Sequence, residues 1–172
     1  MIIDFHTHIF SPNIKENRSK YIDSDSCFAA LYSGKNADLA TADELINSMD
    51  KHGIDISVVL NIGWTRQDLC HETNDYILES VNRYPERLVG FCSVQPRSLE
   101  ATVDEIKHCA QGGIKGVGEM RPDIQLFDLR DEEVMKPFIE AVSQHNLILL
   151  THASEPVGHK YPGKGSVTPE LL

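Results

Sequence analysis

The sequence lacks a surplus of positive charge and any long apolar run. Its 16 lysines and arginines face 26 aspartates and glutamates, which gives a formal net charge of -10. That charge repels nucleic-acid backbones and anionic membrane surfaces, so we expect neither as a partner. No apolar stretch approaches the roughly 20 residues that a membrane-spanning helix needs. These two absences favour a soluble protein that acts on small molecules.

Paired cysteines and glycine-rich nucleotide motifs are missing as well. The four cysteines lie far apart and form no Cys-x-x-Cys pair: Cys27, Cys70, Cys92 and Cys109. An apolar strand is predicted where the charged and apolar regions of a signal peptide would have to be, so we expect a reducing cytoplasm. No G-x-G-x-x-G or G-x-x-x-x-G-K motif follows a predicted strand, which argues against a nucleotide-binding sheet.

The residues that are present alternate between strand and helix patterns. At 172 residues, with 41% hydrophobic and 24% charged residues, the chain has the composition of one globular domain over 1–172. Near-continuous apolar runs predict buried strands at 2–8, 55–62, 88–94, 114–120 and 147–150. Amphipathic patterns predict helices at about 41–53, 68–83, 98–112 and 131–145. This order predicts an α/β protein with a parallel sheet.

The polar segment 10–40 interrupts this alternation. It is rich in serine, asparagine, aspartate, lysine and glycine. Loops of this length are uncommon inside a compact domain and usually serve a function. We therefore expect a substrate loop.

Two histidines at the end of the first predicted strand suggest a metal site. Side chains alternate along a strand, so His6 and His8 point to the same side, with Cα atoms roughly 6 to 7 Å apart. Two imidazoles at that spacing can bind one ion, although a catalytic zinc site needs about three protein ligands. Without its context, such a pair is more often two incidental surface or core histidines.

Further metal-ligating residues occur where later strands end. Glu119 lies at the end of the fourth predicted strand and His152 at the end of the fifth. Active-site residues of (β/α) barrels come from these strand ends, so we expect these side chains to meet His6 and His8 at one mouth. A structural alternative pairs Glu119 with Arg121, two residues further on.

The remaining histidines on predicted helices are interpreted as structural or solvated. His52 and His145 lie in last turns, where a cation suits the helix dipole. His71 and His108 are judged to have no acidic or histidine partner at ligand spacing. We expect no metal site there.

Taken together, these segments resemble the amidohydrolase superfamily. The resemblance is carried by Asp4-Phe5-His6-Thr7-His8, by Gly116-Val117-Gly118-Glu119 and by Thr151-His152, in this order along the chain. Within the superfamily, the sequence is most similar to the amidohydrolase-related branch of metal-dependent hydrolases, which includes enzymes like aminocarboxymuconate-semialdehyde decarboxylase.

The resemblance implies a fold and a set of site residues. The fold is a TIM-type (β/α) barrel, with His6, His8 and His152 as metal ligands and Glu119 at a position that bridges two metals in several branches. The segment 155–162 resembles a loop that borders the pocket, so His159 and Tyr161, together with Arg121, are predicted to bind substrate. For His159, a solvated loop histidine is an equal alternative.

The sequence departs from the family pattern in its length. Family members continue through strands 6, 7 and 8, which carry another histidine and the aspartate expected to transfer protons. The sequence ends at Leu172, after about five strand-helix units. A full barrel typically needs about 250 residues. We therefore expect a fragment of a longer protein or a truncated relative, and a catalytic aspartate beyond residue 172.

Three functions follow from this resemblance. The preferred hypothesis is a hydrolase in which a divalent metal, expected to be Zn²⁺, activates water for attack on an amide, ester or lactone carbon, because Glu119 suits a second metal. The first alternative is a metal-dependent non-oxidative decarboxylase. The second is a non-catalytic fragment or interaction module. Its uncovered fifth strand predicts either a homo-oligomer or a missing C-terminal half.

Overall fold

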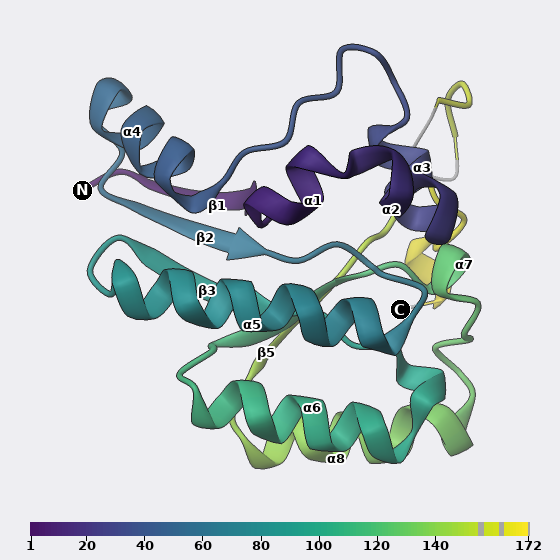
Figure 1. Cartoon of the computed structure of the whole chain (residues 1–172). Coiled ribbons are helices and arrows are strands. Elements are labelled where there is room, and N and C mark those ends of the chain that lie inside the picture. The colour runs from purple at the N-terminus through teal and green to yellow at the C-terminus, as the bar shows by residue number, and fades with distance from the viewer. Residues whose placement is uncertain (155–156, 162–163, 172) are drawn as a thin grey trace.

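The computed structural model describes residues 1–154, 157–161 and 164–171, and these residues form one sheet of five parallel strands (Figure 1). The strands are β1 (Ile3–His8), β2 (Ile56–Leu60), β3 (Leu88–Cys92), β4 (Gly116–Met120) and β5 (Ile148–Thr151). They lie in the sheet in chain order, β1-β2-β3-β4-β5. This is a half-barrel that corresponds to the amino-terminal part of a TIM barrel, so the predicted fold class is confirmed.

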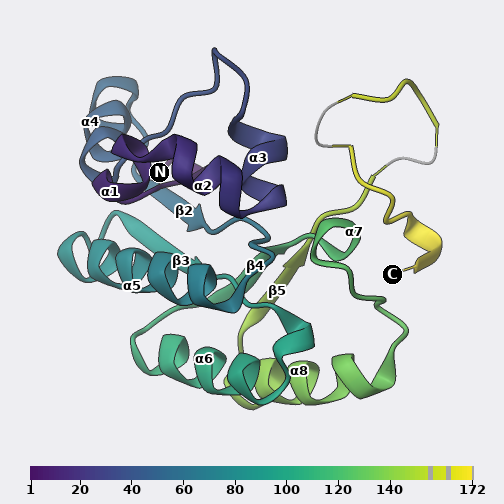
Figure 2. The same ribbon diagram turned by 45° about the vertical axis from the view of Figure 1, so that its right-hand side comes forward.

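One long helix connects each strand to the next. These helices are α4 (Ala42–His52), α5 (Gln67–Arg83), α6 (Glu100–Gln111) and α8 (Glu132–Gln144). They cover the same face of the sheet (Figures 1 and 2), and their apolar sides share one core with it, including Met49, Ile77, Ile106 and Phe138. None of the described helices is both long and apolar enough to cross a bilayer. Short elements complete the described chain: η1 (Pro96–Ser98), α7 (Pro122–Gln125) and η2 (Pro169–Leu171).

The segment 10–40 is not the loop that its composition predicts. It contains three short helices, α1 (Pro12–Glu16), α2 (Arg18–Ser24) and α3 (Ser26–Tyr32). Phe28 in α3 stacks on Trp64, with ring centroids 5.2 Å apart and planes 10° apart. The buried Asp25 caps α3 by accepting from the backbone N–H of Cys27 and Phe28. Aromatic packing and capping hold these helices, and neither is visible as periodicity.

The prediction that the first strand is buried is also wrong. Phe5 is 71% exposed, because β1 is an edge strand that pairs only with β2 among the described residues. The opposite edge strand, β5, exposes 61% of Ile148. Apolar residues on the central strands are buried, for example Val59 on β2 and Val117 on β4. Both edges of the half-barrel therefore present apolar side chains to solvent.

Candidate metal centre

His6 and His8 converge at the carboxyl end of β1. Their Nε2 atoms are 3.1 Å apart, and their ring planes are inclined by 79°. The register of β1 against β2 shifts between Asp4 and Thr7, where three steps on β1 face two on β2. Bulges of this kind often re-aim side chains beside functional sites. The local irregularity therefore falls on the residues that present the two imidazoles.

Backbone groups of β2 orient the His8 ring. Its Nδ1 lies 3.2 Å from the carbonyl oxygen of Leu60, and the hydroxyl of Thr7 donates to the carbonyl of Val58 at 2.9 Å. A hydrogen bond from Nδ1–H to that carbonyl leaves the Nε2 lone pair directed toward His6. Burial lowers the pKa of His8, and the neighbouring His6 lowers it further. Both effects favour the neutral imidazole, which is the metal-binding form.

Glu119 on β4 reaches the histidine pair from across the half-barrel. Its Oε2 lies 3.6 Å from His6 Nε2, and its backbone N–H donates to the carbonyl of Asn61. The register between β4 and β5 also shifts here, between Val117 and Met120. Gly118 occupies this shift with φ of +140°, and a Cβ at that position would lie 2.3 Å from the carbonyl oxygen of Leu150. Only glycine fits there without displacing β5, the strand next to the one that carries Glu119.

These three side chains have the donor set of a divalent metal site. The ligand atoms of His6, His8 and Glu119 all lie within 4.8 Å of one another. Two nitrogens bound to one ion at about 2.0 to 2.1 Å, with angles near 90° to 109°, are separated by about 2.8 to 3.4 Å. The observed 3.1 Å between the His6 and His8 nitrogens falls in this range. Two imidazoles and a carboxylate suit Zn²⁺, Mn²⁺ or a related ion, so the residues fit the implied metal.

His152 lies beside this group and contacts one of its members. Its Nδ1 is 2.7 Å from Glu119 Oε1, and its Nε2 is 3.3 Å from the hydroxyl of Ser154. One Glu119 carboxylate thus faces His6 of β1 through one oxygen and His152, just after β5, through the other. The structure brings His6, His8 and Glu119 together and holds His152 one contact away. A role of His152 as a metal ligand stays a prediction.

The predicted substrate-binding residues are placed differently. Arg121 is buried, and its guanidinium pairs with Asp123 at 3.2 Å, whereas the ionic partners of Glu119 are His6 and His152. The alternative in which Arg121 neutralises Glu119 is therefore not what the structure shows. His159 and Tyr161 are exposed and lie against each other, with ring centroids 5.9 Å apart. The roles of all three toward a substrate stay predictions.

Part of the predicted pocket loop lies outside the described residues. These positions are Glu155, Pro156 and Pro162.

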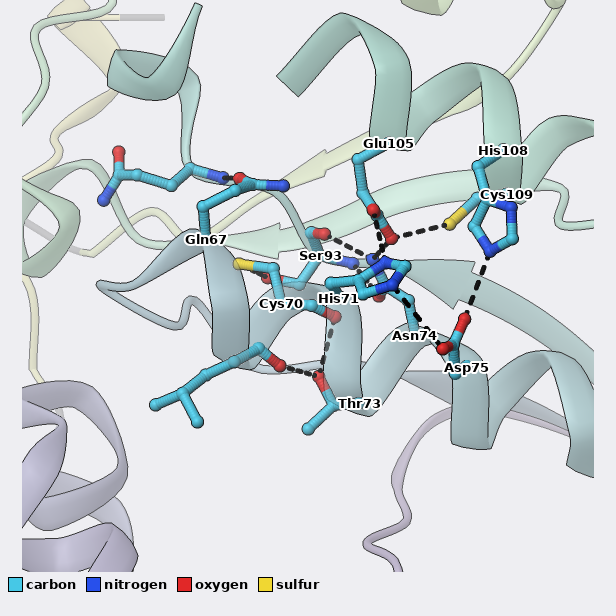
Figure 3. A network of polar contacts seen from close by, with 12 residues as sticks. Gln67, Cys70, His71, Thr73, Asn74, Asp75, Ser93, Glu105, His108 and Cys109 are labelled. Carbon is cyan, nitrogen blue, oxygen red and sulfur yellow. Dashed lines mark hydrogen bonds and ion pairs between the residues drawn. The ribbon is translucent and has the colours of Figure 1, made fainter. Parts of the chain in front are cut away.

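A second group of metal-ligating side chains was missed in the sequence. Figure 3 shows His71 and Asp75 on α5 facing His108 on α6, and their ligand atoms also lie within 4.8 Å of one another. The interpretation of His71 as lacking an acidic partner at ligand spacing is wrong, because Asp75 follows it by four residues. For His108, the partner comes from the neighbouring helix. The i, i+4 spacing was therefore the visible signal, and the packing of α5 against α6 supplies the rest.

Comparison with known proteins gives a consistent picture. The family model described as Amidohydrolase matches residues 3–170. A 2-amino-3-carboxymuconate-6-semialdehyde decarboxylase of Dictyostelium discoideum is 24% identical over 180 residues, which is 91% of this chain and 50% of that protein. A manganese-bound 5-carboxyvanillate decarboxylase of Novosphingobium aromaticivorans superposes with a TM-score of 0.72 at 22% identity, over 88% of this chain and 50% of that one. The corresponding enzyme of Sphingomonas paucimobilis has a TM-score of 0.63 at 18% identity, over 90% and 52%.

These relatives correct the preferred function. All three are decarboxylases, so the hypothesis of a hydrolase that attacks an amide, ester or lactone is wrong, and the decarboxylase alternative is the better supported one. The argument for hydrolysis rested on Glu119 as a bridge between two metals. The structure places Glu119 between His6 and His152, and its role toward one or two metals stays a prediction. The chain spans about half the length of the relatives it matches.

Proposed function

Because the chain belongs to the amidohydrolase family, we propose that it provides the metal-binding half of a metal-dependent non-oxidative decarboxylase. The observation that carries this proposal is the convergence of His6, His8 and Glu119 at the carboxyl ends of β1 and β4. In (β/α) barrels, that end of the sheet holds the active site. The activity named for the relatives supports decarboxylation as the reaction.

The proposed metal ligands are His6, His8 and Glu119, with His152 close enough to join or to orient Glu119. A bound divalent ion supplies a Lewis acid that holds substrate oxygens and stabilises developing negative charge. Manganese in one of the relatives supports Mn²⁺ as well as the Zn²⁺ expected from the sequence. Both ions accept imidazole together with carboxylate.

The chain's own residues contribute orientation and shielding. The Leu60 carbonyl and Glu119 fix the ring orientations of His8 and His152, so these groups need little rearrangement before substrate binds. His6 is the most open member, with 49% of its side chain exposed, whereas Glu119 is 18% exposed.

The substrate class follows from the reaction. A non-oxidative decarboxylation breaks the bond between a carbon and its carboxylate and releases CO₂, and the electron pair left on that carbon takes up a proton. A conjugated or aromatic carbon best accommodates that pair. We therefore propose a small aromatic or conjugated carboxylic acid as the substrate.

Metal binding and CO₂ release test this proposal together. Protein stripped by a chelator is reloaded with Mn²⁺ or Zn²⁺, its metal content is measured, and CO₂ release is followed with a panel of carboxylated phenols that includes 5-carboxyvanillate. We call the group of His6, His8 and Glu119 the strand-end group. Substituting both His6→Ala and His8→Ala should remove the metal bound there and abolish the activity. His52→Ala, at the exposed end of α4, should change neither.

Two results would contradict the proposal. The first is equal metal occupancy of the strand-end group in wild type and in the double variant. The second is a metal-loaded protein that contains this chain together with the carboxyl-terminal half found in the relatives, and that releases no CO₂ from any acid of the panel.

A further inference from the structure

The side chains of His71, Asp75 and His108 form a compact group on the helical face of the half-barrel. His71 and Asp75 lie one turn apart on α5, and His108 faces them from α6 (Figure 3). His108 Nε2 lies 3.1 Å from Asp75 Oδ1, and His71 Nε2 lies 3.7 Å from Asp75 Oδ2. We propose that this group, the helix-face site, binds a divalent transition-metal ion of the Zn²⁺ class.

A buried carboxylate behind His71 supports this assignment. Glu105 Oε2 lies 2.8 Å from His71 Nδ1, and only 7% of the Glu105 side chain is exposed. A carboxylate can only accept here, so Nδ1 carries a proton, and Nε2 is the ring nitrogen left to bind an ion beside Asp75. A carboxylate that orients a histidine in this way is the usual outer partner of a metal-ligating imidazole.

Glu105 is itself held in place by the interior. Asn74, which is fully buried, donates from Nδ2 to Glu105 Oε1 at 2.8 Å. Asn74 Nδ2 also donates to the carbonyl of Ser93 at 2.8 Å, and Asn74 Oδ1 accepts from the Ser93 backbone N–H at 2.8 Å. The position of His71 is therefore tied to β3 and its following residues through two buried side chains. This degree of support is unusual for an exposed histidine that only pairs with a surface aspartate.

The three donors leave room for water or a further ligand. Their side chains are 49% to 55% exposed, so an ion bound to them would keep a side open to solvent. Two imidazoles and one carboxylate make a known three-ligand zinc set that takes water as the fourth ligand. Because His71 and Asp75 come from α5 and His108 from α6, such an ion would also join the two helices.

The helix-face site shares no residue with the proposed decarboxylase centre. The two can therefore be tested separately in one protein. The experiment uses the His6→Ala/His8→Ala protein, so that Zn²⁺ binding at the strand ends does not contribute. Zn²⁺ is titrated by calorimetry, and Co²⁺ is used as a spectroscopic probe, since its visible absorption reports tetrahedral coordination by nitrogen and oxygen.

We expect one equivalent of Zn²⁺ to bind. His108→Ala and Asp75→Asn should each weaken it at least about tenfold, and Glu105→Gln should weaken it about 10- to 100-fold, as outer-partner substitutions do. Glu79→Gln, an exposed carboxylate on α5, serves as the matched control and should leave binding unchanged. Added Zn²⁺ should raise the melting temperature, because a ligand that binds only the folded state stabilises it. His108→Ala should abolish that rise.

The competing explanation is an ion-pair group without metal affinity. It predicts no Zn²⁺ binding in the His6→Ala/His8→Ala protein, or binding that His108→Ala leaves unchanged, and either result overturns the proposal. Circular dichroism of each variant verifies the fold. His108→Gln, which keeps a polar side chain of similar length, provides a second variant if His108→Ala is unstable.

Discussion

The two groups of side chains that we propose as metal ligands in this half-barrel are built in different ways. The strand-end group takes His6 and His8 from β1 and Glu119 from β4, two strands that are not neighbours in the sheet. The helix-face group takes His71 and Asp75 from one helix and His108 from the next. The first therefore depends on the curvature and bulges of the sheet, and the second on helix spacing and on the packing of two adjacent helices.

The partners that orient the histidines of the two groups also differ: one is a backbone atom and the other is a side chain. His8 is oriented by a backbone carbonyl of the neighbouring strand, whereas His71 is oriented by the buried side chain of Glu105. A backbone partner cannot be removed by substitution, but a side-chain partner can. The helix-face group should therefore be the easier of the two to dismantle from the interior, and the strand-end group should depend mainly on its own ligands.

The largest expected effect comes from Asn74→Leu, which removes the interior support of the helix-face group. It leaves the Glu105 carboxylate and the backbone groups of Ser93 without their buried partner, at a cost of about 3 kcal/mol or more. Denaturant unfolding measures the loss, and Asn47→Leu on the exposed side of α4 is the control. A loss below about 1 kcal/mol would show that Asn74 does not support Glu105.

The second largest expected effect is a loss of metal affinity at the strand-end group alone. Glu119→Gln removes the anionic oxygen that faces His6, so metal affinity there should fall at least about 100-fold, or about 2.8 kcal/mol. Zn²⁺ affinity at the helix face should stay the same, and Glu79→Gln is again the control. Lower thermal stability with unchanged strand-end metal stoichiometry would instead make Glu119 a structural acid that holds His152.

The sequence predicted that His6, His8, Glu119 and His152 lie together, because the carboxyl ends of parallel strands meet at one end of a barrel. The structure brings the ligand atoms of the first three within 4.8 Å of one another and holds His152 against Glu119, while their role as metal ligands stays a prediction. The helices of 10–40 could not be predicted, since their stability comes from the stacking of Phe28 on Trp64, which are distant in the chain. His108 could not be joined to Asp75 because the relative rotation of α5 and α6 is a property of packing.

A smaller expected effect is a change in self-association when the edges of the half-barrel are altered. Because the edge strands β1 and β5 expose the apolar side chains of Phe5 and Ile148, we expect the chain to self-associate as its concentration rises. Phe5→Lys with Ile148→Lys should shift the mass from light scattering toward the 19.3 kDa monomer. Leu126→Lys, at a residue equally exposed but outside the strands, should not. A wild-type mass of 19.3 kDa at every concentration would contradict this prediction.

The smallest effect is a difference in the pH response of one histidine from each group, measured by NMR on metal-free protein. Burial and the neighbouring His6 lower the pKa of His8 below its ordinary 6.5, although Glu119 and the Leu60 carbonyl act in the opposite direction. The hydrogen bond that His71 donates to Glu105, aided by the charges of Glu105 and Asp75, raises the pKa of His71 above 6.5. We expect the two ring signals to titrate on opposite sides of this value.

The stability contributions of these two histidines should then have opposite signs. Since the folded state binds the His71 proton more tightly, that contribution is complete below about pH 6.5 and is lost as the pH rises through the raised pKa. For His8, the unfolded state binds the proton more tightly, so its contribution is complete above about pH 6.5 and declines as the pH falls. Glu105→Gln should return the His71 signal toward 6.5 without moving that of His8. If both signals moved together, the two groups would be electrostatically coupled, and they could not be treated as independent sites.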